Sequence, residues 1–241
     1  NPRVLFTGPA GSGKTLLAVE TAKRNYLNNK RTLLLCFNRI LGSFLRNIIL
    51  GIDKTGKILE ANSVHKYFYQ TIKMAGLAQE LDKLSRGKSS DEIYDEILPT
   101  VFIKAAEKTK PLAYDCLIID EGQDLLSTNY LLALESVLKG GFKEGNWIVF
   151  LDPGGQAMLF NRFSFEAYEY LKQLGSVYKL NLNVRNTVQI ATQATIISGF
   201  PSGKATIEGP KVEYKLCDGI IDMAIKLLDL INQLIDVEKI P

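Results

Sequence analysis

The chain has 241 residues, of which 46% are hydrophobic and 23% charged, and its formal net charge is +3. This balance is ordinary for a globular protein and excludes a mainly disordered chain, because enough apolar surface is present to build a core. No run approaches the roughly 18 apolar residues that a membrane span requires. The N-terminal residues also lack the pattern of a secretory signal. We therefore expect a cytoplasmic protein with no membrane partner.

Charge is unevenly distributed along the chain. Between Thr21 and Leu59 there are eight lysines and arginines and one acid, which gives this segment +7 and leaves −4 for the rest. Such a segment favours either a surface for a polyanion or a solvated helix face. Cys36, Cys116 and Cys217 lie far apart in apolar surroundings, and His65 is the single histidine. We expect reduced, buried thiols and no disulfide or metal cluster.

Short apolar runs alternate with stretches of helical spacing. Strands are predicted at residues 3–7, 32–37, 57–61, 117–120, 147–151 and 177–182, and a helix at 15–28. The runs are continuously apolar, which is typical of parallel strands covered on both faces. The predicted fold class is therefore α/β, in three layers with right-handed crossovers.

Two regions read as additions to this pattern. Residues 67–110 carry many charges and no convincing strand, with a Gly/Ser-rich break at 85–90, which predicts a small helical insertion. Residues 199–209 resemble a linker, followed by a predicted strand at 211–216 and an amphipathic helix at 220–235. One strand and one helix cannot bury themselves. We therefore expect one domain at 1–200 and the opening of a second at 201–241.

The strongest motif lies between the first strand and the first helix. It consists of Gly8, Pro9, Ala10, Gly11, Ser12, Gly13, Lys14 and Thr15. Glycines allow backbone N–H groups to converge on phosphate oxygens, and the helix N-terminus adds partial positive charge. Lys14 can reach the β- and γ-phosphates, and the Thr15 hydroxyl can bind Mg²⁺. This is the P-loop pattern in its required context, and the alternative is a chance glycine-rich turn.

Two adjacent acids, Asp120 and Glu121, follow the apolar run at 117–119. Acids at the carboxyl end of a strand lie where α/β proteins form their sites. Asp120 suits the Mg²⁺ shell, and Glu121 suits a general base for the water that attacks the γ-phosphate. The alternative is a solvated acidic turn. With the P-loop, these residues predict hydrolysis of a nucleoside triphosphate.

Five segments in order resemble the motifs of superfamily 1 helicases of the UvrD/Rep kind. DEGQD at 120–124 resembles motif II, and LLLCFNR at 33–39 resembles motif Ia. SVH at 63–65, FLDPGGQ at 150–156 and LNLNVRNT at 180–187 resemble motifs Ib, III and IV. The resemblance covers roughly residues 3–195 and implies a RecA-like ATPase domain. It places the insertion at 67–110 where that family has its accessory subdomain.

The resemblance also implies ligands and roles. The cofactors are ATP and Mg²⁺, and the partner is single-stranded DNA, with RNA also open. Phe37 would stack on a base, as aromatic residues do in strand-tracking channels, unless it is a core residue. Asn38, Arg39, Ser63 and His65 would touch phosphates or sugars, and the alternative for His65 is a helix start or a satisfied buried histidine.

Three further residues take roles at the γ-phosphate by the same resemblance. Gln123 and Gln156 would couple its state to the DNA groove, and the alternative for each is a solvated turn residue. Arg185 would bind the γ-phosphate and stabilise charge in the transition state. The alternative for Arg185 is a surface salt bridge.

The sequence departs from the family pattern in three places. Three residues instead of two separate Asp152 from Gln156, and Val184 replaces an aromatic residue that commonly stacks on adenine. No candidate for motifs V and VI follows residue 200, so the rest of the second RecA-like domain is an expected partner. We therefore expect nucleotide binding with little turnover and no unwinding by this chain. Three functions stay open: a helicase or translocase motor, a regulatory NTPase switch without unwinding, and a small-molecule kinase.

Overall fold

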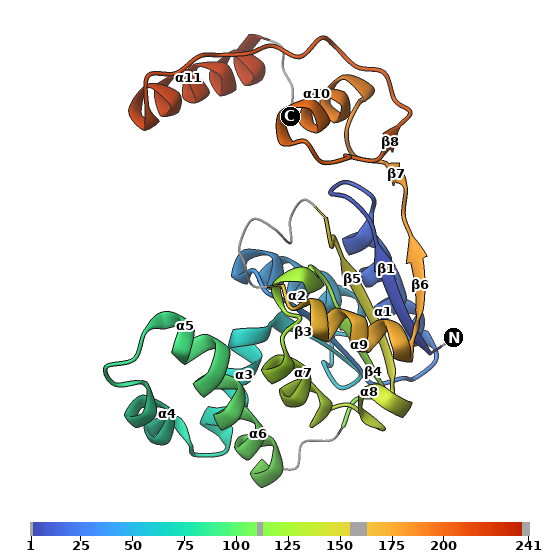
Figure 1. Cartoon of the computed structure of the whole chain (residues 1–241), viewed down its shortest axis with the longest axis vertical. Coiled ribbons are helices and arrows are strands. Elements are labelled where there is room, and N and C mark those ends of the chain that lie inside the picture. The colour runs from blue at the N-terminus through green and yellow to red at the C-terminus, as the bar shows by residue number, and fades with distance from the viewer. Residues whose placement is uncertain (1, 110–112, 155–162, 238–241) are drawn as a thin grey trace.

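A computed structural model describes residues 2–109, 113–154 and 163–237 of the chain. A parallel sheet flanked by helices forms the body, and a C-terminal arm stands beyond one end of the sheet (Figure 1). No helix within these described residues is long and apolar enough to cross a membrane.

The central sheet has six strands in the order β3-β2-β4-β5-β1-β6, and its pairs are all parallel. Its strands are β1 (Arg3–Thr7), β2 (Thr32–Cys36), β3 (Leu59–Ser63), β4 (Cys116–Ile119), β5 (Asn146–Leu151) and β6 (Ser176–Lys179). In the arm, β7 (Leu182–Asn183) pairs with β8 (Lys204–Ala205). The α/β fold class with a parallel sheet is thus confirmed, with the third strand two residues later than predicted.

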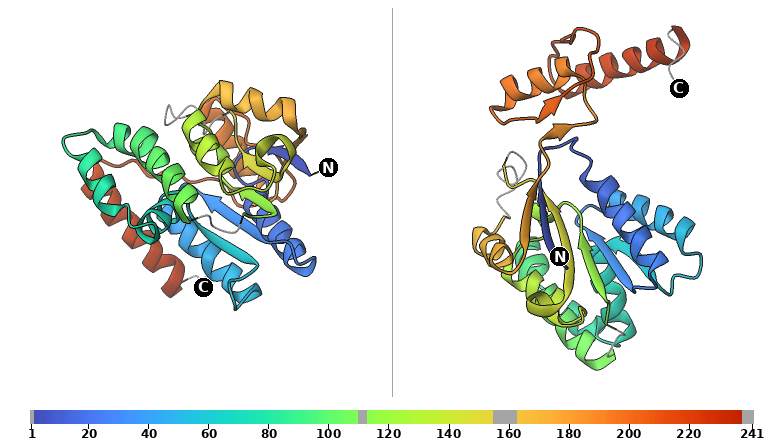
Figure 2. Two further views of the ribbon diagram at one scale, coloured as in Figure 1. Left: turned by 90° about the horizontal axis from the view of Figure 1, so that it is seen from below. Right: turned by 90° about the vertical axis from the view of Figure 1, so that its right-hand side faces the viewer.

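Helices cover both faces of this sheet (Figure 2). The α-helices are α1 (Lys14–Leu27), α2 (Arg39–Ile52), α3 (Val64–Met74), α4 (Ala78–Ser85), α5 (Ser90–Glu92), α6 (Leu98–Thr109), α7 (Thr128–Glu135), α8 (Gly141–Glu144), α9 (Phe165–Leu174), α10 (Val188–Ser198) and α11 (Ile220–Asn232). Short turns of other helix types are η1 (Ile93–Ile97), η2 (Gly122–Asp124) and η3 (Gln233–Val237).

Two apolar clusters fill the layers. On one face, Ala22 of α1 and Leu45 of α2 pack with Leu34 of β2. The small side chain of Ala22 lets its helix approach the sheet closely. On the other face lies the larger cluster, in which Phe68 of α3 stacks on Phe102 of α6 at 4.0 Å between ring centroids. Truncation of such a buried aromatic ring costs about 3–5 kcal/mol, so this layer contributes a large part of the stability of the fold.

The described residues between β3 and β4 are mainly helical, from α3 through α6. A capping box between Ser89 and Glu92 begins α5. Helices α3 and α6 belong to the same core cluster as α7 and α9, so they cover the sheet and are not detached from it. The division into domains at residue 200 stays a prediction.

Two expectations for the C-terminal part were wrong. Residues 211–216 form no strand, and Tyr214 and Leu216 are exposed, because no neighbouring strand lies beside them to supply hydrogen bonds. The pairing in the arm uses β8 instead, inside the predicted linker. Cys36 and Cys116 are buried as expected, but Cys217 is exposed in the loop before α11.

Candidate functional site

The parallel arrangement brings the carboxyl ends of the strands to one edge of the sheet. The P-loop follows β1, Asp120 and Glu121 follow β4, and Asp152 follows β5. Because β5 lies between β1 and β4, its end separates the P-loop from the two acids by a single strand. This edge of an open α/β sheet is where ligands bind.

The P-loop has the backbone geometry of an anion cradle. Gly11 and Gly13 have φ angles of 83° and 85°, a left-handed conformation that is rare for residues with a Cβ. Gly13 is also the N-cap of α1, so the loop leads directly into a helix N-terminus. Gly8 N–H donates to the Leu151 carbonyl at 3.1 Å, which holds the loop against β5. Left-handed residues within a turn of this kind direct successive backbone N–H groups toward one concavity.

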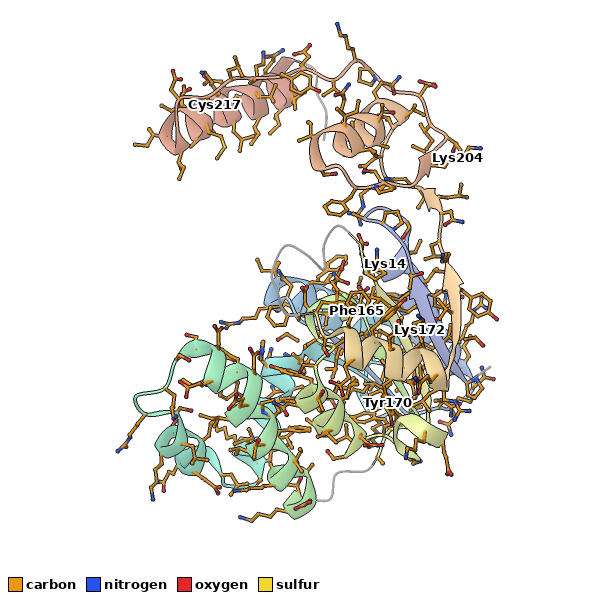
Figure 3. All side chains as sticks on the ribbon, viewed as in Figure 1. Lys14, Phe165, Tyr170, Lys172, Lys204 and Cys217 are labelled. Atoms are coloured by element: carbon orange, nitrogen blue, oxygen red, sulfur yellow. The ribbon has the colours of Figure 1, made fainter. Side chains whose placement is uncertain are left out.

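Lys14 lies folded back within the P-loop. Its ammonium donates to the carbonyls of Gly8 at 2.7 Å and Pro9 at 2.9 Å, and the residue is 5% exposed. Burial lowers the pKa of Lys14, and the nearby carboxylates of Glu121, Asp152 and Asp120 oppose that shift. Figure 3 shows Lys14 at the end of the sheet nearest the arm, which carries Lys204 and Cys217. Hydrogen bonds to charged acceptors are stronger than those to neutral carbonyls, so the ammonium of Lys14 can exchange these carbonyls for phosphate oxygens.

Asp120 is fully buried, with 0% of its surface exposed, and neither carboxylate oxygen makes a well-formed hydrogen bond to a described residue. Burial raises the pKa of Asp120 to about 6, although the nearby Thr15 hydroxyl and Glu121 N–H partly oppose the shift. The Ser12 hydroxyl is also buried and has no hydrogen-bond partner among the residues that the structure describes. Unpaired buried oxygens are costly, and a cation at Asp120 and Thr15 would satisfy them. The donor set of carboxylate and hydroxyl oxygens fits Mg²⁺.

Glu121 and Gln123 form a bridge to the end of β5. The Gln123 side chain donates to the Glu121 carboxylate at 2.6 Å and accepts from Asp152 N–H at 3.0 Å. Glu121 has a φ of 54°, an uncommon conformation for a residue with a side chain, and such strain is found at functional sites. Gly122 permits the turn because a Cβ there would lie 2.6 Å from Val149 Cγ1. Gln123 is buried, which excludes its alternative as a solvated turn residue.

Beside the P-loop lies a cavity of about 320 Å³ with mainly apolar walls. Its lining residues include Thr15, Leu16 and Phe44, together with Val184 and Arg185 from the segment after β7. Arg185 is exposed and makes no recorded ion pair with a described residue, so its salt-bridge alternative finds no support. Phe44 was missed by sequence reasoning, because it lies on α2 in no motif. It provides an aromatic ring in the cavity where Val184 provides none.

A second, larger cavity of about 1410 Å³ collects residues predicted to contact nucleic acid. Phe37, Asn38, Arg39 and His65 all line it. The Phe37 ring meets the His65 ring edge-on at 5.0 Å between centroids. His65 Nε2 also lies 2.9 Å from the Tyr130 hydroxyl, so the histidine has a structural partner as well. The predicted grouping of these four side chains is therefore present in space.

Other features of this region differ from the prediction. Asn38 is the N-cap of α2, and its side chain accepts from Ile40 N–H and Leu41 N–H at 2.8 and 3.0 Å.

Ser63 is buried beneath α2 at Gly42 and does not line the cavity. Three acids, Asp91, Asp95 and Asp124, line the same cavity as the basic and aromatic residues. Gln156 lies outside the described residues.

Asn183 is a further functional candidate, to which the sequence analysis assigned no role. It is 2% exposed, and its side chain donates to the carbonyl of Ala10 in the P-loop at 3.3 Å. Val184 N–H donates to the Gly11 carbonyl at 2.9 Å. The signal in the sequence was the motif IV resemblance, which pointed to Arg185 and not to its neighbour.

No family model matches this chain, and no curated protein sequence matches it. Among solved structures, it is similar to the flagellar accessory protein FlaH from Methanocaldococcus jannaschii. That similarity has a TM-score of 0.36 and 9% sequence identity, and it covers 73% of this chain and 69% of that chain. The site described above does not depend on this likeness.

Proposed function

We propose that the chain binds a nucleoside triphosphate with Mg²⁺ at the P-loop and hydrolyses it. The observation that carries this proposal is the buried carboxylate of Asp120, which lies by the Thr15 hydroxyl and Glu121 N–H but makes no well-formed hydrogen bond to a described residue. If this edge of the sheet served only for packing, the folded protein would be more stable with that carboxylate paired or replaced by a neutral group. The left-handed glycines of the loop and the helix start behind them supply the matching anion cradle.

The chain's own residues divide the work of hydrolysis. Lys14 would exchange the carbonyls of Gly8 and Pro9 for phosphate oxygens, while Thr15 and Asp120 would hold Mg²⁺. That ion, when bound, neutralises negative charge on the phosphates. Glu121 would accept a proton from the attacking water, with its carboxylate oriented by Gln123 at 2.6 Å. Arg185 would approach the γ-phosphate from the cavity wall.

The cavity beside Thr15 would receive the base. Its walls are apolar apart from Thr15, Arg185 and loop backbone, so they offer stacking without a set of side chains that reads the base edges. Phe44 would supply the aromatic contact that Val184 cannot. We therefore propose a purine nucleotide with weak discrimination between ATP and GTP.

We further propose that the parent activity is a nucleic-acid-dependent motor of the superfamily 1 kind. Support comes from the cavity that joins Phe37, Arg39 and His65, because stacking rings beside a cation suit single-stranded nucleic acid. Titration of a fluorescent oligonucleotide with the chain would test this. Binding weakened by Arg39→Ala, but not by Lys57→Ala, supports the proposal, and equal effects of both variants count against it.

A second candidate is a nucleotide-dependent switch that does not track nucleic acid. The observation that favours it is the presence of Asp91, Asp95 and Asp124 in the same cavity, since carboxylates repel a phosphate backbone. The two candidates differ in one result. A motor binds the oligonucleotide at physiological salt, whereas a switch does not.

The nucleotide-binding proposal has its own test, independent of nucleic acid. The chain is titrated with fluorescent ATP in the presence of Mg²⁺, together with Lys14→Ala and the exposed-site control Lys30→Ala. We expect the Lys14→Ala variant to bind at least about a hundredfold more weakly, since a buried charge-assisted contact is lost. The Lys30→Ala variant should match the unaltered chain. Equal affinity in all three proteins would overturn the proposal.

A further inference from the structure

The P-loop is closed on its outer side by the segment that follows β6. A Cβ at Gly8 would lie 2.7 Å from the Leu180 carbonyl oxygen, and a Cβ at Gly11 would lie 2.5 Å from Asn183 Oδ1. Val184 packs over Gly13, where a Cβ would meet its Cγ2 at 3.6 Å. The glycines of the loop therefore make room for this segment as well as for phosphates.

Asn183 makes the polar contacts of this seam. Its side-chain N–H₂ donates to the Ala10 carbonyl at 3.3 Å and to the Ser202 carbonyl at 2.8 Å. Its Oδ1 accepts from Arg185 N–H at 3.2 Å and Asn186 N–H at 2.9 Å. One buried amide thus joins the bend of the P-loop to the backbone that carries Arg185. The same amide also reaches the loop before β8.

Sheet pairing does not provide this link. The β1–β6 register ends at Thr7 and Lys179, and Leu180 N–H makes the next bond to the Thr7 carbonyl at 2.7 Å. Beyond that point the chain leaves the sheet for the two-residue strand β7. The described bonds between residues 182–186 and the P-loop are those of Asn183 and Val184 N–H.

We propose that Asn183 is a positioning residue that latches the P-loop to the Arg185 segment, so that nucleotide binding and the order of residues 182–186 are thermodynamically coupled. This inference rests on the proposed nucleotide site. Coupling of this kind is reciprocal: nucleotide that favours the closed loop stabilises the segment, and the latched segment raises nucleotide affinity by the same factor. The donor half of the amide acts on the loop, whereas the acceptor half sets the backbone of Arg185.

Two variants separate these halves. Asn183→Leu has similar volume and removes both, while Asn183→Asp keeps an acceptor for Arg185 N–H and loses the donor to Ala10. Asn62→Leu is the matched control, because Asn62 is also a buried asparagine, bonded to Gln70 at the far edge of the sheet. Affinities for Mg–ADP and Mg–ATP are measured for each, and circular dichroism checks that each is folded.

We expect Asn183→Leu to weaken ADP and ATP binding at least about tenfold, the equivalent of one or two buried hydrogen bonds. Asn183→Asp should weaken ADP binding to a similar degree but keep the ATP-to-ADP affinity ratio of the unaltered chain. Asn62→Leu should leave both affinities unchanged. Unchanged ADP affinity in folded Asn183→Leu would overturn the latch.

Hydrogen exchange supplies a readout that a purely structural asparagine would not move. In the unaltered chain, Mg–ADP should slow exchange of the Asn186 amide, which donates to Asn183 Oδ1 and does not line the cavity that receives the base. This measurement needs no variant, so it decides the question even if Asn183→Leu does not fold. Absence of the effect in a chain that binds ADP contradicts the latch alone, whereas a chain that binds no nucleotide contradicts the proposed function itself.

Discussion

Two buried aspartates in this molecule have opposite surroundings. Asp53, at the end of α2, is 1% exposed and accepts bonds from Thr55, Ile58 and Leu59 at 2.6–3.0 Å. Asp120 is equally buried, but the donors near it are only the Thr15 hydroxyl and Glu121 N–H, and neither oxygen makes a well-formed hydrogen bond to a described residue. The pKa of Asp53 falls to about 2 because hydrogen bonds outweigh burial, while burial raises the pKa of Asp120 to about 6. Burial alone therefore does not mark a functional carboxylate, and the two residues differ in how well donors satisfy their buried oxygens.

The largest effect on stability is expected from Asp53. Asp53→Ala would leave the N–H groups of Ile58 and Leu59 without their acceptor, which we expect to lower the free energy of unfolding by about 3 kcal/mol. The midpoint temperature of thermal unfolding would then fall by roughly 6–12 °C for a chain of this size. Nucleotide affinity should not change. The exposed Asp82→Ala is the control. A loss of nucleotide affinity in Asp53→Ala would contradict the assignment of Asp53 to a purely structural role.

In contrast to Asp53→Ala, Asp120→Asn should stabilise the folded protein. The folded pKa of Asp120, about 6, lies above its ordinary value of 3.8, so its ionised form is disfavoured in the nucleotide-free protein at neutral pH. We expect the variant to raise the free energy of unfolding by roughly 2 kcal/mol at pH 7.5. Denaturant titration measures this difference. If Asp120→Asn destabilises the chain at that pH, the carboxylate was paired after all.

The same shift sets a pH dependence. A carboxyl group with a raised folded pKa contributes stability that is full below its unfolded value of 3.8 and is lost as pH rises through about 6. The gain from Asp120→Asn should therefore shrink toward zero near pH 4. Magnesium competes with the proton at this group, so Mg²⁺ affinity should rise by up to about tenfold per pH unit below 6 and level off above 7. A flat profile between pH 5 and pH 7 would show that Asp120 does not ligate the ion.

The smallest expected effect concerns the cavity beside Thr15. Val184→Tyr places a ring opposite Phe44, and we expect purine nucleotides to bind about threefold to tenfold more tightly, as aromatic pairs add roughly 0.5–1.5 kcal/mol. Competition of ATP and GTP for a fluorescent nucleotide measures the gain. Leu132→Tyr, at an exposed position on α7, is the control. No gain for either nucleotide would place the base elsewhere.

The features of the fold and the site that could be predicted from the sequence are those formed by residues close together along the chain. The P-loop and the acids at 120–121 are local patterns, and continuous apolar runs such as 32–37 indicated the parallel sheet correctly. Asn183 lies 173 residues from Ala10, so no local pattern could indicate their contact. The strand expected at 211–216 failed for a related reason, because an apolar pattern does not reveal whether a neighbouring strand exists. The bonds of Asp53 to Thr55 form a local turn, yet the sequence showed only a lone acid in a basic segment.

We propose above all that Asp120 and the P-loop hold one Mg–nucleotide between them. The most direct measurement is the affinity of ADP with Mg²⁺ and with EDTA, by calorimetry at pH 7.5, for the unaltered chain, Asp120→Asn and Asp53→Asn. Mg²⁺ should strengthen binding at least about tenfold in the unaltered chain and in Asp53→Asn, and have no effect in Asp120→Asn. An equal effect of Mg²⁺ on all three proteins would contradict the claim.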